Sequence, residues 1–113
     1  MAKAAKKLAG GRLRVKVLER AQCEKLSMGS FLGVARGATE PPKFLVLEYR
    51  VPGAKDNVCV VGKGLTFDTG GISIKPSGGM EEMKWDMGGA GVVVGLMKAL
   101  AGRKAKVNAV GVA

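Results

Sequence analysis

The sequence contains no histidine, a side chain that many metal sites in proteins use as a ligand. Any metal site in this chain must therefore be built from oxygen ligands, thiolates or a neutral amine. A lysine becomes such an amine ligand only when its pKa is strongly lowered, which burial beside a cation can achieve.

Long apolar runs and a secretory leader are also lacking. No stretch of 18 apolar residues occurs, so no transmembrane helix is expected. The segment 1–7 is rich in lysine and has no apolar centre of the kind found in signal peptides. The two cysteines, Cys23 and Cys59, are far apart, which favours reduced thiols over a disulfide framework. We therefore expect a cytoplasmic protein with no membrane partner.

Acidic residues are outnumbered, because 19 Lys and Arg against 9 Asp and Glu give a net charge of +10. Such an excess indicates either a nucleic acid or an acidic membrane surface as a partner, or simply a solvated basic face. Aromatic residues make up only 4% of the chain, basic residues do not alternate with them, and no nucleic-acid reader motif is present. Nucleic acid is therefore the less favoured partner.

The patterning of apolar residues predicts an α/β protein of 113 residues, enough for one domain or part of one. Residues 30–42 and 63–79 are expected to be irregular, and 51–57 to form a turn or hairpin loop. The run 58–62 is typical of a buried strand. Strands that alternate with helices indicate an α/β sheet. The expected strands are 12–18, 43–50, 58–62 and 105–113, and the expected helices are 2–9, 19–27 and 80–101.

Charged side chains with possible chemistry follow the third expected strand. Lys63 comes directly after it, and Asp68 lies in a Gly-rich loop just beyond, where Gly70 and Gly71 allow a tight bend. In open α/β sheets, ligands bind at the carboxyl ends of the strands. The carboxylates of Asp68 and Asp86, with the amine of Lys63, would suit a divalent cation. From spacing alone, a salt bridge between Lys63 and Asp68 is the simpler interpretation.

Two segments, VGKGLTFDTGGISIKP and GMEEMKWDMGGAG, resemble the signature of the leucyl (cytosol) aminopeptidase family. The preceding segment MGSFLGVARGATEPPKFLVLEYR is similar to the entry to that family's catalytic domain. The resemblance implies a partial mixed sheet flanked by helices, as in zinc-peptidase-like catalytic domains. It also implies a metal-dependent aminopeptidase that uses two divalent metal ions, Mn²⁺ or Zn²⁺. Peptides would be its substrates, and it would assemble as a homo-hexamer.

The resemblance also implies roles for particular residues. Lys63 would be an amine ligand of the tighter metal, Asp86 would bind the same metal, and Asp68 would bridge both metals. Lys75 would be catalytic and direct its ammonium at the scissile carbonyl or its oxyanion. Met80 is expected near the pocket for the substrate side chain. Met83 is placed there too, although it is equally suited to the core.

The family's pattern continues with an Asn-Thr-Asp-Ala-Glu-Gly-Arg block, which the chain does not contain up to Ala113. In the family, the Asp and Glu of that block are metal ligands and its Arg holds a bicarbonate. We therefore expect residues 1–113 to form an incomplete aminopeptidase catalytic domain that is inactive by itself. The alternatives are a basic nucleic-acid-binding protein and a non-catalytic assembly protein.

Overall fold

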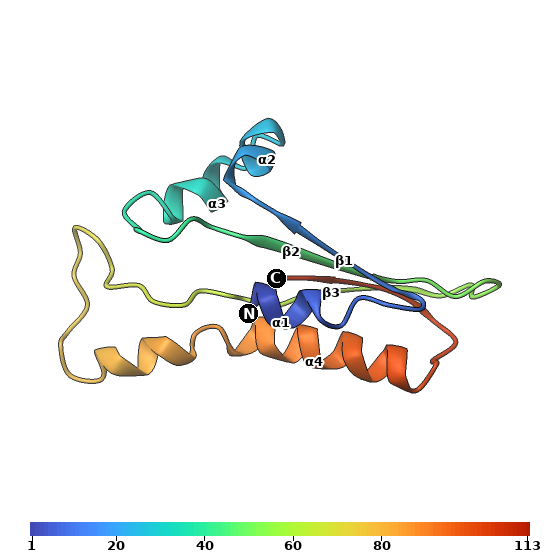
Figure 1. The fold of residues 1–113 in the computed structure, drawn as a ribbon. Helices are drawn as coiled ribbons and strands as arrows, with labels where there is room; N and C mark the ends of the chain where they lie inside the picture. Colours follow the sequence, from blue (N-terminus) through green and yellow to red (C-terminus); the bar gives the residue numbers. More distant parts are fainter.

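The computed structural model describes residues 1–113 as a four-stranded mixed sheet flanked by helices, and Figure 1 views this sheet along its plane. This arrangement confirms the α/β class and the partial mixed sheet. No helix is both long and apolar enough to cross a lipid bilayer. The elements are α1 (Ala2–Lys6), β1 (Leu13–Leu18), α2 (Arg20–Lys25), α3 (Gly29–Val34), β2 (Phe44–Tyr49), β3 (Asn57–Val61), a 3-10 helix (Met80–Trp85), α4 (Gly88–Gly102) and β4 (Asn108–Val112).

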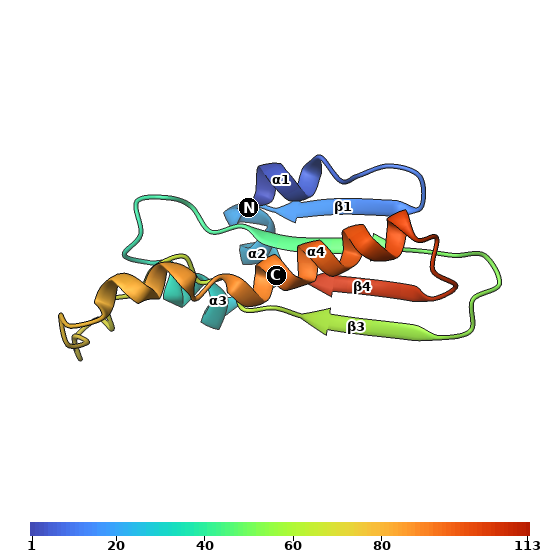
Figure 2. The ribbon, with the colours of Figure 1, turned by 90° about the horizontal axis from the view of Figure 1, so that it is seen from below.

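The strand order is β1-β2-β4-β3, so the last strand in the chain lies between β2 and β3 (Figure 2). β2 is antiparallel to both β1 and β4, whereas β3 and β4 are parallel and are connected by α4. The segment 51–57 therefore joins two strands that are not neighbours, and the hairpin alternative for it is wrong. Asn108 holds this segment to β4, since its Oδ1 accepts the Val51 N–H at 2.9 Å and its Nδ2 donates to the Ala54 carbonyl.

The hydrophobic core lies between the sheet and the helices α1 and α4, which cover the same face (Figure 1). Alternate residues of β2 are buried there, as the period of two in a strand requires. Leu47 and Met97 are completely buried, and Tyr49 is 1% exposed while its hydroxyl donates to the Ala105 carbonyl at 3.1 Å. The core residues are Ala5, Leu13, Leu45, Leu47, Tyr49, Val93, Met97 and Ala109.

The opposite face of the sheet is covered only at one end, by α2 and α3. β3 is the outermost strand, and most of its residues are exposed, including Val61 at 76%. The expectation that 58–62 is a buried strand is therefore wrong. An apolar run is buried in a parallel sheet when helices cover both faces, whereas α4 covers only one face of the sheet here and no strand lies on the outer side of β3 (Figure 1).

Two helical segments also differ from the sequence-based expectation. The expected helix 80–101 is divided into a 3-10 helix that ends at Trp85 and an α-helix that begins at Gly88. Residues 30–42, expected to be irregular, contain most of helix α3. Tertiary packing supports α3, since the ring of Phe31 meets that of Phe44 edge-to-face with 5.6 Å between ring centroids.

Candidate metal and catalytic site

Lys63 is positioned by a close contact between the end of β3 and the start of α4. A Cβ atom at Gly62 would overlap the carbonyl oxygen of Gly89, and one at Gly89 would lie 2.8 Å from the Lys63 nitrogen. The Ala90 N–H donates to the Lys63 carbonyl at 2.9 Å. Glycine at both 62 and 89 lets the two backbones approach, and this contact fixes the backbone of Lys63 at the carboxyl end of the parallel strands.

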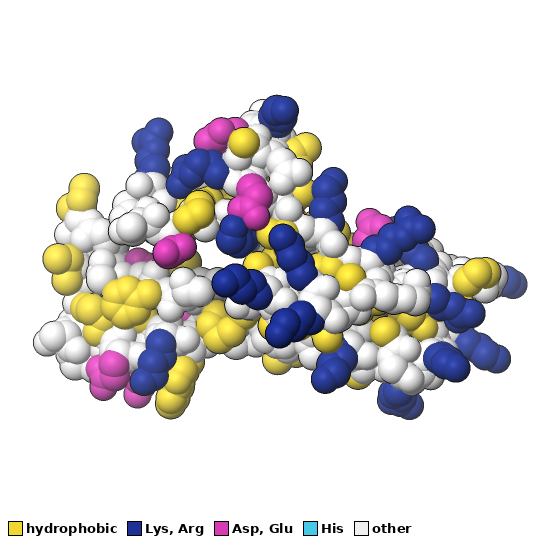
Figure 3. Space-filling view, viewed as in Figure 1, with side chains coloured by type: hydrophobic (Ala, Val, Ile, Leu, Met, Phe, Trp, Pro, Cys, Tyr) yellow, Lys and Arg dark blue, Asp and Glu magenta, His cyan; other side chains and the backbone are white.

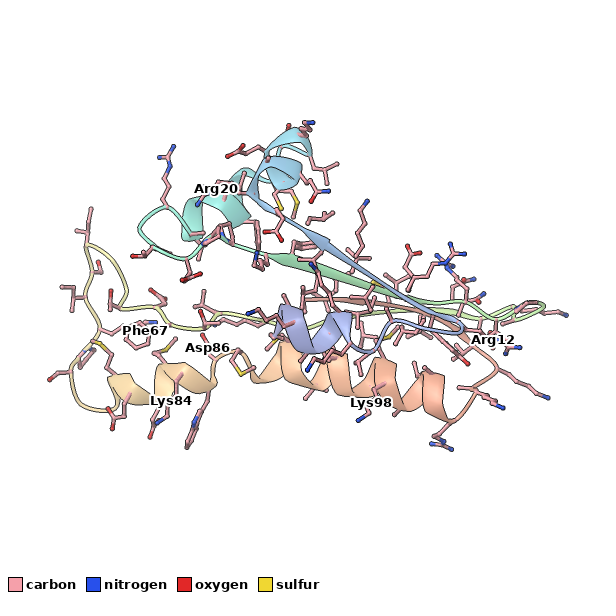
Figure 4. The ribbon with its side chains drawn as sticks, viewed as in Figure 1. Arg12, Arg20, Phe67, Lys84, Asp86 and Lys98 are labelled. Carbon is pink, nitrogen blue, oxygen red and sulfur yellow. The ribbon has the colours of Figure 1, made fainter.

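The side chain of Lys63 extends to Asp86, with Nζ 2.6 Å from Oδ2. Asp86 directly follows the 3-10 helix, and Figure 4 shows it at the junction with α4, near the segment that carries Phe67. Its side chain is 27% exposed, whereas that of Lys63 is 64% exposed. Because the expected helix is divided at this point, the Asp86 carboxylate lies beside Lys63 at the end of β3.

Asp68 and Lys75 close the loop between β3 and the 3-10 helix. Lys75 Nζ donates to Asp68 Oδ2 at 2.8 Å and to the Asp68 carbonyl at 3.0 Å. Asp68 Oδ1 accepts the Gly70 N–H at 2.7 Å, and the Lys75 N–H donates to the Thr69 carbonyl. Gly70 has a φ of 102°, and a Cβ there would overlap the Ser73 carbonyl oxygen, so glycine is required at this bend.

These contacts lower the pKa of the Asp68 carboxyl below its ordinary value. The hydrogen bond from Lys75 is the largest cause and the Gly70 N–H is the next, while the charges of Lys75 and Lys63 contribute further. Asp68 is therefore anionic at neutral pH, which is the state that a metal ligand requires.

The four charged residues that the sequence singled out form two ion pairs, Lys63 with Asp86 and Lys75 with Asp68, in the segment between β3 and α4. The simple salt bridge between Lys63 and Asp68 is not formed, since each residue pairs with a different partner. Met83 lies outside the core cluster, and its sulfur is 3.4 Å from Lys75 Nζ, so its interpretation as a core residue is wrong. Met80 begins the 3-10 helix and makes no hydrogen bond to the cluster through its side chain.

Sequence reasoning missed the role of the Gly62–Gly89 contact and the thioether beside Lys75. A signal for the first was available, because a glycine at the end of a strand and another at the start of a helix are typical of close backbone packing. No comparable signal identified the contact of Met83 with Lys75, which joins side chains of the 3-10 helix and the preceding loop.

The side chains of Lys63, Asp68 and Asp86 fit part of a divalent metal site. The Lys63 ammonium lies beside the Asp86 carboxylate, where a cation could take its place if the amine lost its proton. Asp68 and Asp86 supply carboxylate oxygens, and Lys63 supplies one nitrogen. No cluster of three or more Asp, Glu, His or Cys side chains exists in the chain, so these residues supply too few anionic ligands for two tightly bound cations.

A hollow of about 720 Å³ adjoins this site between α3 and the segment that follows β3. Lys63 borders it, and its other lining is mainly apolar, with Phe31, Val34, Leu45 and Phe67 among the residues. Asp68, Lys75, Met80 and Asp86 do not line it. Of the four charged residues, only Lys63 therefore borders the hollow, and a substrate pocket near Met80 stays a prediction.

A mixed sheet with charged side chains gathered beyond its parallel strands is the arrangement of a ligand-binding α/β domain. The model of the cytosol aminopeptidase family, catalytic domain, matches residues 1–113. The chain belongs to this family.

Similar proteins of known sequence are much longer than this chain. A probable cytosol aminopeptidase of Brucella anthropi is 54% identical over 112 residues, which are 98% of this chain and 22% of that protein. One of Methylibium petroleiphilum is 58% identical over 101 residues, 88% of this chain and 21% of that protein. The chain therefore spans about a fifth of the length of these relatives.

Solved structures agree in fold. The bottromycin maturation enzyme BotP in complex with Mn superposes with a TM-score of 0.87 at 39% identity, covering 98% of this chain and 24% of that one. A mutant of tomato leucine aminopeptidase superposes with a TM-score of 0.81 at 41% identity, covering 98% of this chain and 21% of that one. The cytosol aminopeptidase of Coxiella burnetii superposes with a TM-score of 0.87 at 34% identity, covering 98% of this chain and 24% of that one.

Proposed function

We propose that residues 1–113 form the part of an aminopeptidase catalytic domain that begins its metal site and supplies a catalytic lysine. The reaction would be the removal of amino-terminal residues, leucine among them, from peptides in the cytoplasm. One observation carries this proposal: the charged residues of the family signature form two ion pairs beyond the carboxyl end of β3, Lys63 with Asp86 and Lys75 with Asp68. The manganese in the BotP complex supports a divalent cation, Mn²⁺ or Zn²⁺, as cofactor.

Three residues would hold the cofactor. Asp68 and Asp86 would supply carboxylate oxygens, and Lys63 would supply a nitrogen in its deprotonated form. A pair of bound divalent cations would lower the pKa of a water molecule and so provide a nucleophile at neutral pH. The contact between Gly62 and Gly89 keeps the backbone of Lys63 in place, so that only its side chain would need to turn toward a bound cation.

Lys75 would stabilise the negative charge that develops on the scissile carbonyl oxygen. Its ammonium has three N–H groups, of which two are directed at Asp68 oxygens and the third at Met83 sulfur. A thioether is a weak acceptor, so a carbonyl oxygen can replace it at little cost. The two bonds to Asp68 meanwhile hold the ammonium in one orientation, as electrostatic stabilisation of a transition state requires.

A chimaera tests this proposal. Residues 1–113 replace the matching segment of the Brucella anthropi relative, and hydrolysis of a leucine chromogenic substrate is measured with Mn²⁺. Removing one charge-stabilising donor typically costs about 10²–10³ in rate, so we expect Lys75→Ala to lower kcat by about that factor. Lys63→Ala should lose metal affinity as well as activity.

The matched control is Lys84→Ala, which removes a nearby exposed lysine that lies over the Trp85 ring and outside the cluster. It should leave kcat and metal affinity unchanged. Equal activity of the Lys63→Ala, Lys75→Ala and parent chimaeras would refute the proposal. The 113-residue chain alone should show no turnover, because it supplies only two carboxylate ligands at the cluster.

A second candidate function, polyanion binding without catalysis, is favoured by one observation. Figure 3 shows Lys and Arg side chains spread over the face that carries α1 and β1, with few acidic side chains among them. If this face binds nucleic acid, affinity should fall steeply with salt concentration and be unaffected by Lys75→Ala. The exposed basic residues of this region are Lys3, Lys6, Lys7, Arg12, Arg14 and Lys16.

A further inference from the structure

The 3-10 helix Met80–Trp85 presents one side to the loop that precedes it. A 3-10 helix has three residues per turn, so side chains three residues apart lie one above the other. Met80, Met83 and Asp86 are partly buried, whereas the four residues between them are exposed. Figure 4 shows Asp86 on the side of the loop and Lys84 on the opposite side. This period of three directs Met83 and Asp86 toward the loop.

Met83 contacts both ion pairs of the candidate site. Its sulfur lies 3.4 Å from Lys75 Nζ, and Lys75 is paired with Asp68. Its backbone carbonyl accepts the Asp86 N–H at 3.1 Å, and Asp86 is paired with Lys63. The two ion pairs are thus connected through one residue. Met83 therefore relates the position of the Lys75 ammonium to that of the Asp86 backbone.

The three acceptors around the Lys75 ammonium differ in strength. The ammonium donates to Asp68 Oδ2 at 2.8 Å and to the Asp68 carbonyl oxygen at 3.0 Å, and its contact with the Met83 sulfur is longer, at 3.4 Å. A carboxylate forms a strong, charge-assisted hydrogen bond, whereas a thioether is a weak acceptor. The bond to Met83 is therefore the one that the ammonium gives up most readily.

We infer that Met83 is a positioning residue for Lys75, an inference that rests on the proposed function. Its sulfur holds the third N–H of the ammonium in the direction in which the substrate carbonyl oxygen later takes its place. The acceptor there has to be weak, since a stronger one would retain the ammonium as negative charge develops on the substrate oxygen. It also has to be present, since otherwise this N–H turns toward other acceptors such as water.

This role differs from that of a pocket wall, which the family resemblance implies for Met83. A pocket wall contacts the substrate side chain and tolerates another apolar side chain of similar volume. A positioning thioether acts on Lys75 through its sulfur atom, which leucine lacks. The two roles therefore predict different effects of Met83→Leu on kcat.

A double-mutant cycle in the Mn²⁺-loaded chimaera tests the inference. Met83→Leu keeps the volume and removes the acceptor, so it should lower kcat about three- to tenfold with little change in KM, as expected for the loss of one hydrogen bond. Met83→Gln places a stronger acceptor there and should lower kcat at least as much. In a Lys75→Ala background, Met83→Leu should lower kcat no further, because the ammonium is gone. The control Glu82→Gln changes an exposed side chain of the same helix and should leave kcat unchanged.

The outcomes separate this inference from the proposed function. If Lys75→Ala leaves kcat unchanged, the proposed function fails and the inference fails with it. If Lys75→Ala lowers kcat but Met83→Leu does not, the inference alone is overturned. An equal loss from Met83→Leu in both backgrounds also overturns it, since Met83 would then act on the fold or the substrate rather than through Lys75. Should circular dichroism show that Met83→Leu is unfolded, the same comparison with Met83→Gln decides.

Discussion

The α4 face of the sheet and the loop of residues 63–79 are stabilised by different interactions. On the sheet, Leu47 and Met97 are completely buried. In the loop, Ile74 is 73% exposed and Ile72 is fully exposed, and the chain is held by the contacts of Asp68 with Lys75 and Gly70. Apolar packing thus stabilises the sheet, whereas polar contacts position the Asp68 carboxylate and the Lys75 ammonium in the loop. Changes in one region should therefore leave the other largely intact.

The largest expected effect lies in the packed region. Leu47→Ala removes a completely buried side chain from the central strand β2 and should lower the free energy of unfolding by about 3 kcal/mol. Urea denaturation measures the loss. Val61→Ala, which truncates a side chain that is 76% exposed, is the control and should change this free energy by less than about 0.5 kcal/mol. Similar losses in both variants would mean that Leu47 does not belong to the core.

A smaller effect is expected where the two regions meet. Gly62→Ala forces the end of β3 away from the start of α4 and should cost about 1–3 kcal/mol of unfolding free energy. Gly95→Ala is the matched control, because it lies in α4 with open space around its Cβ and should stabilise the helix by up to about 1 kcal/mol. Thermal denaturation distinguishes the two. Changes in the unfolding free energy of opposite sign for the two variants support the close contact between Gly62 and Gly89, and changes of the same sign contradict it.

The smallest effect on stability is expected in the loop. Lys75→Met removes the ammonium that bonds Asp68, yet the pair is exposed enough that the midpoint of thermal unfolding should stay the same. Hydrogen exchange should instead become faster for amides of residues 68–75, which this contact holds together. Protection of α4 should be unchanged. Slower exchange in the loop, or faster exchange in α4, would show that the two regions are coupled.

Most of the sheet was predictable from the sequence because its signals are local. The alternation of apolar and charged residues in β1 and the apolar run of β2 identify strands without knowledge of their neighbours. The exposure of β3 was not predictable, since burial depends on what lies beside a strand. The helix α3 was missed for a similar reason, because its support comes from Phe44, a residue distant in sequence.

The candidate site, like the sheet, was predictable from the sequence only in part. The residues Lys63, Asp68, Lys75 and Asp86 were found from the motif, and in the structure they form two ion pairs. Their present pairing was not foreseen, because it depends on the break after Trp85 that turns Asp86 toward the end of β3. Spacing along the chain cannot reveal such a break, since the segment 80–101 has apolar residues throughout.

The strand order has a consequence for synthesis on the ribosome. β1 and β2 can pair as soon as both have emerged, because no other strand lies between them. β3 emerges next, but its only neighbour in the sheet is β4, which follows some fifty residues after it. Until then the backbone groups of β3 that bond β4 have no partner strand. A chaperone that shields extended apolar segments would therefore find its target here.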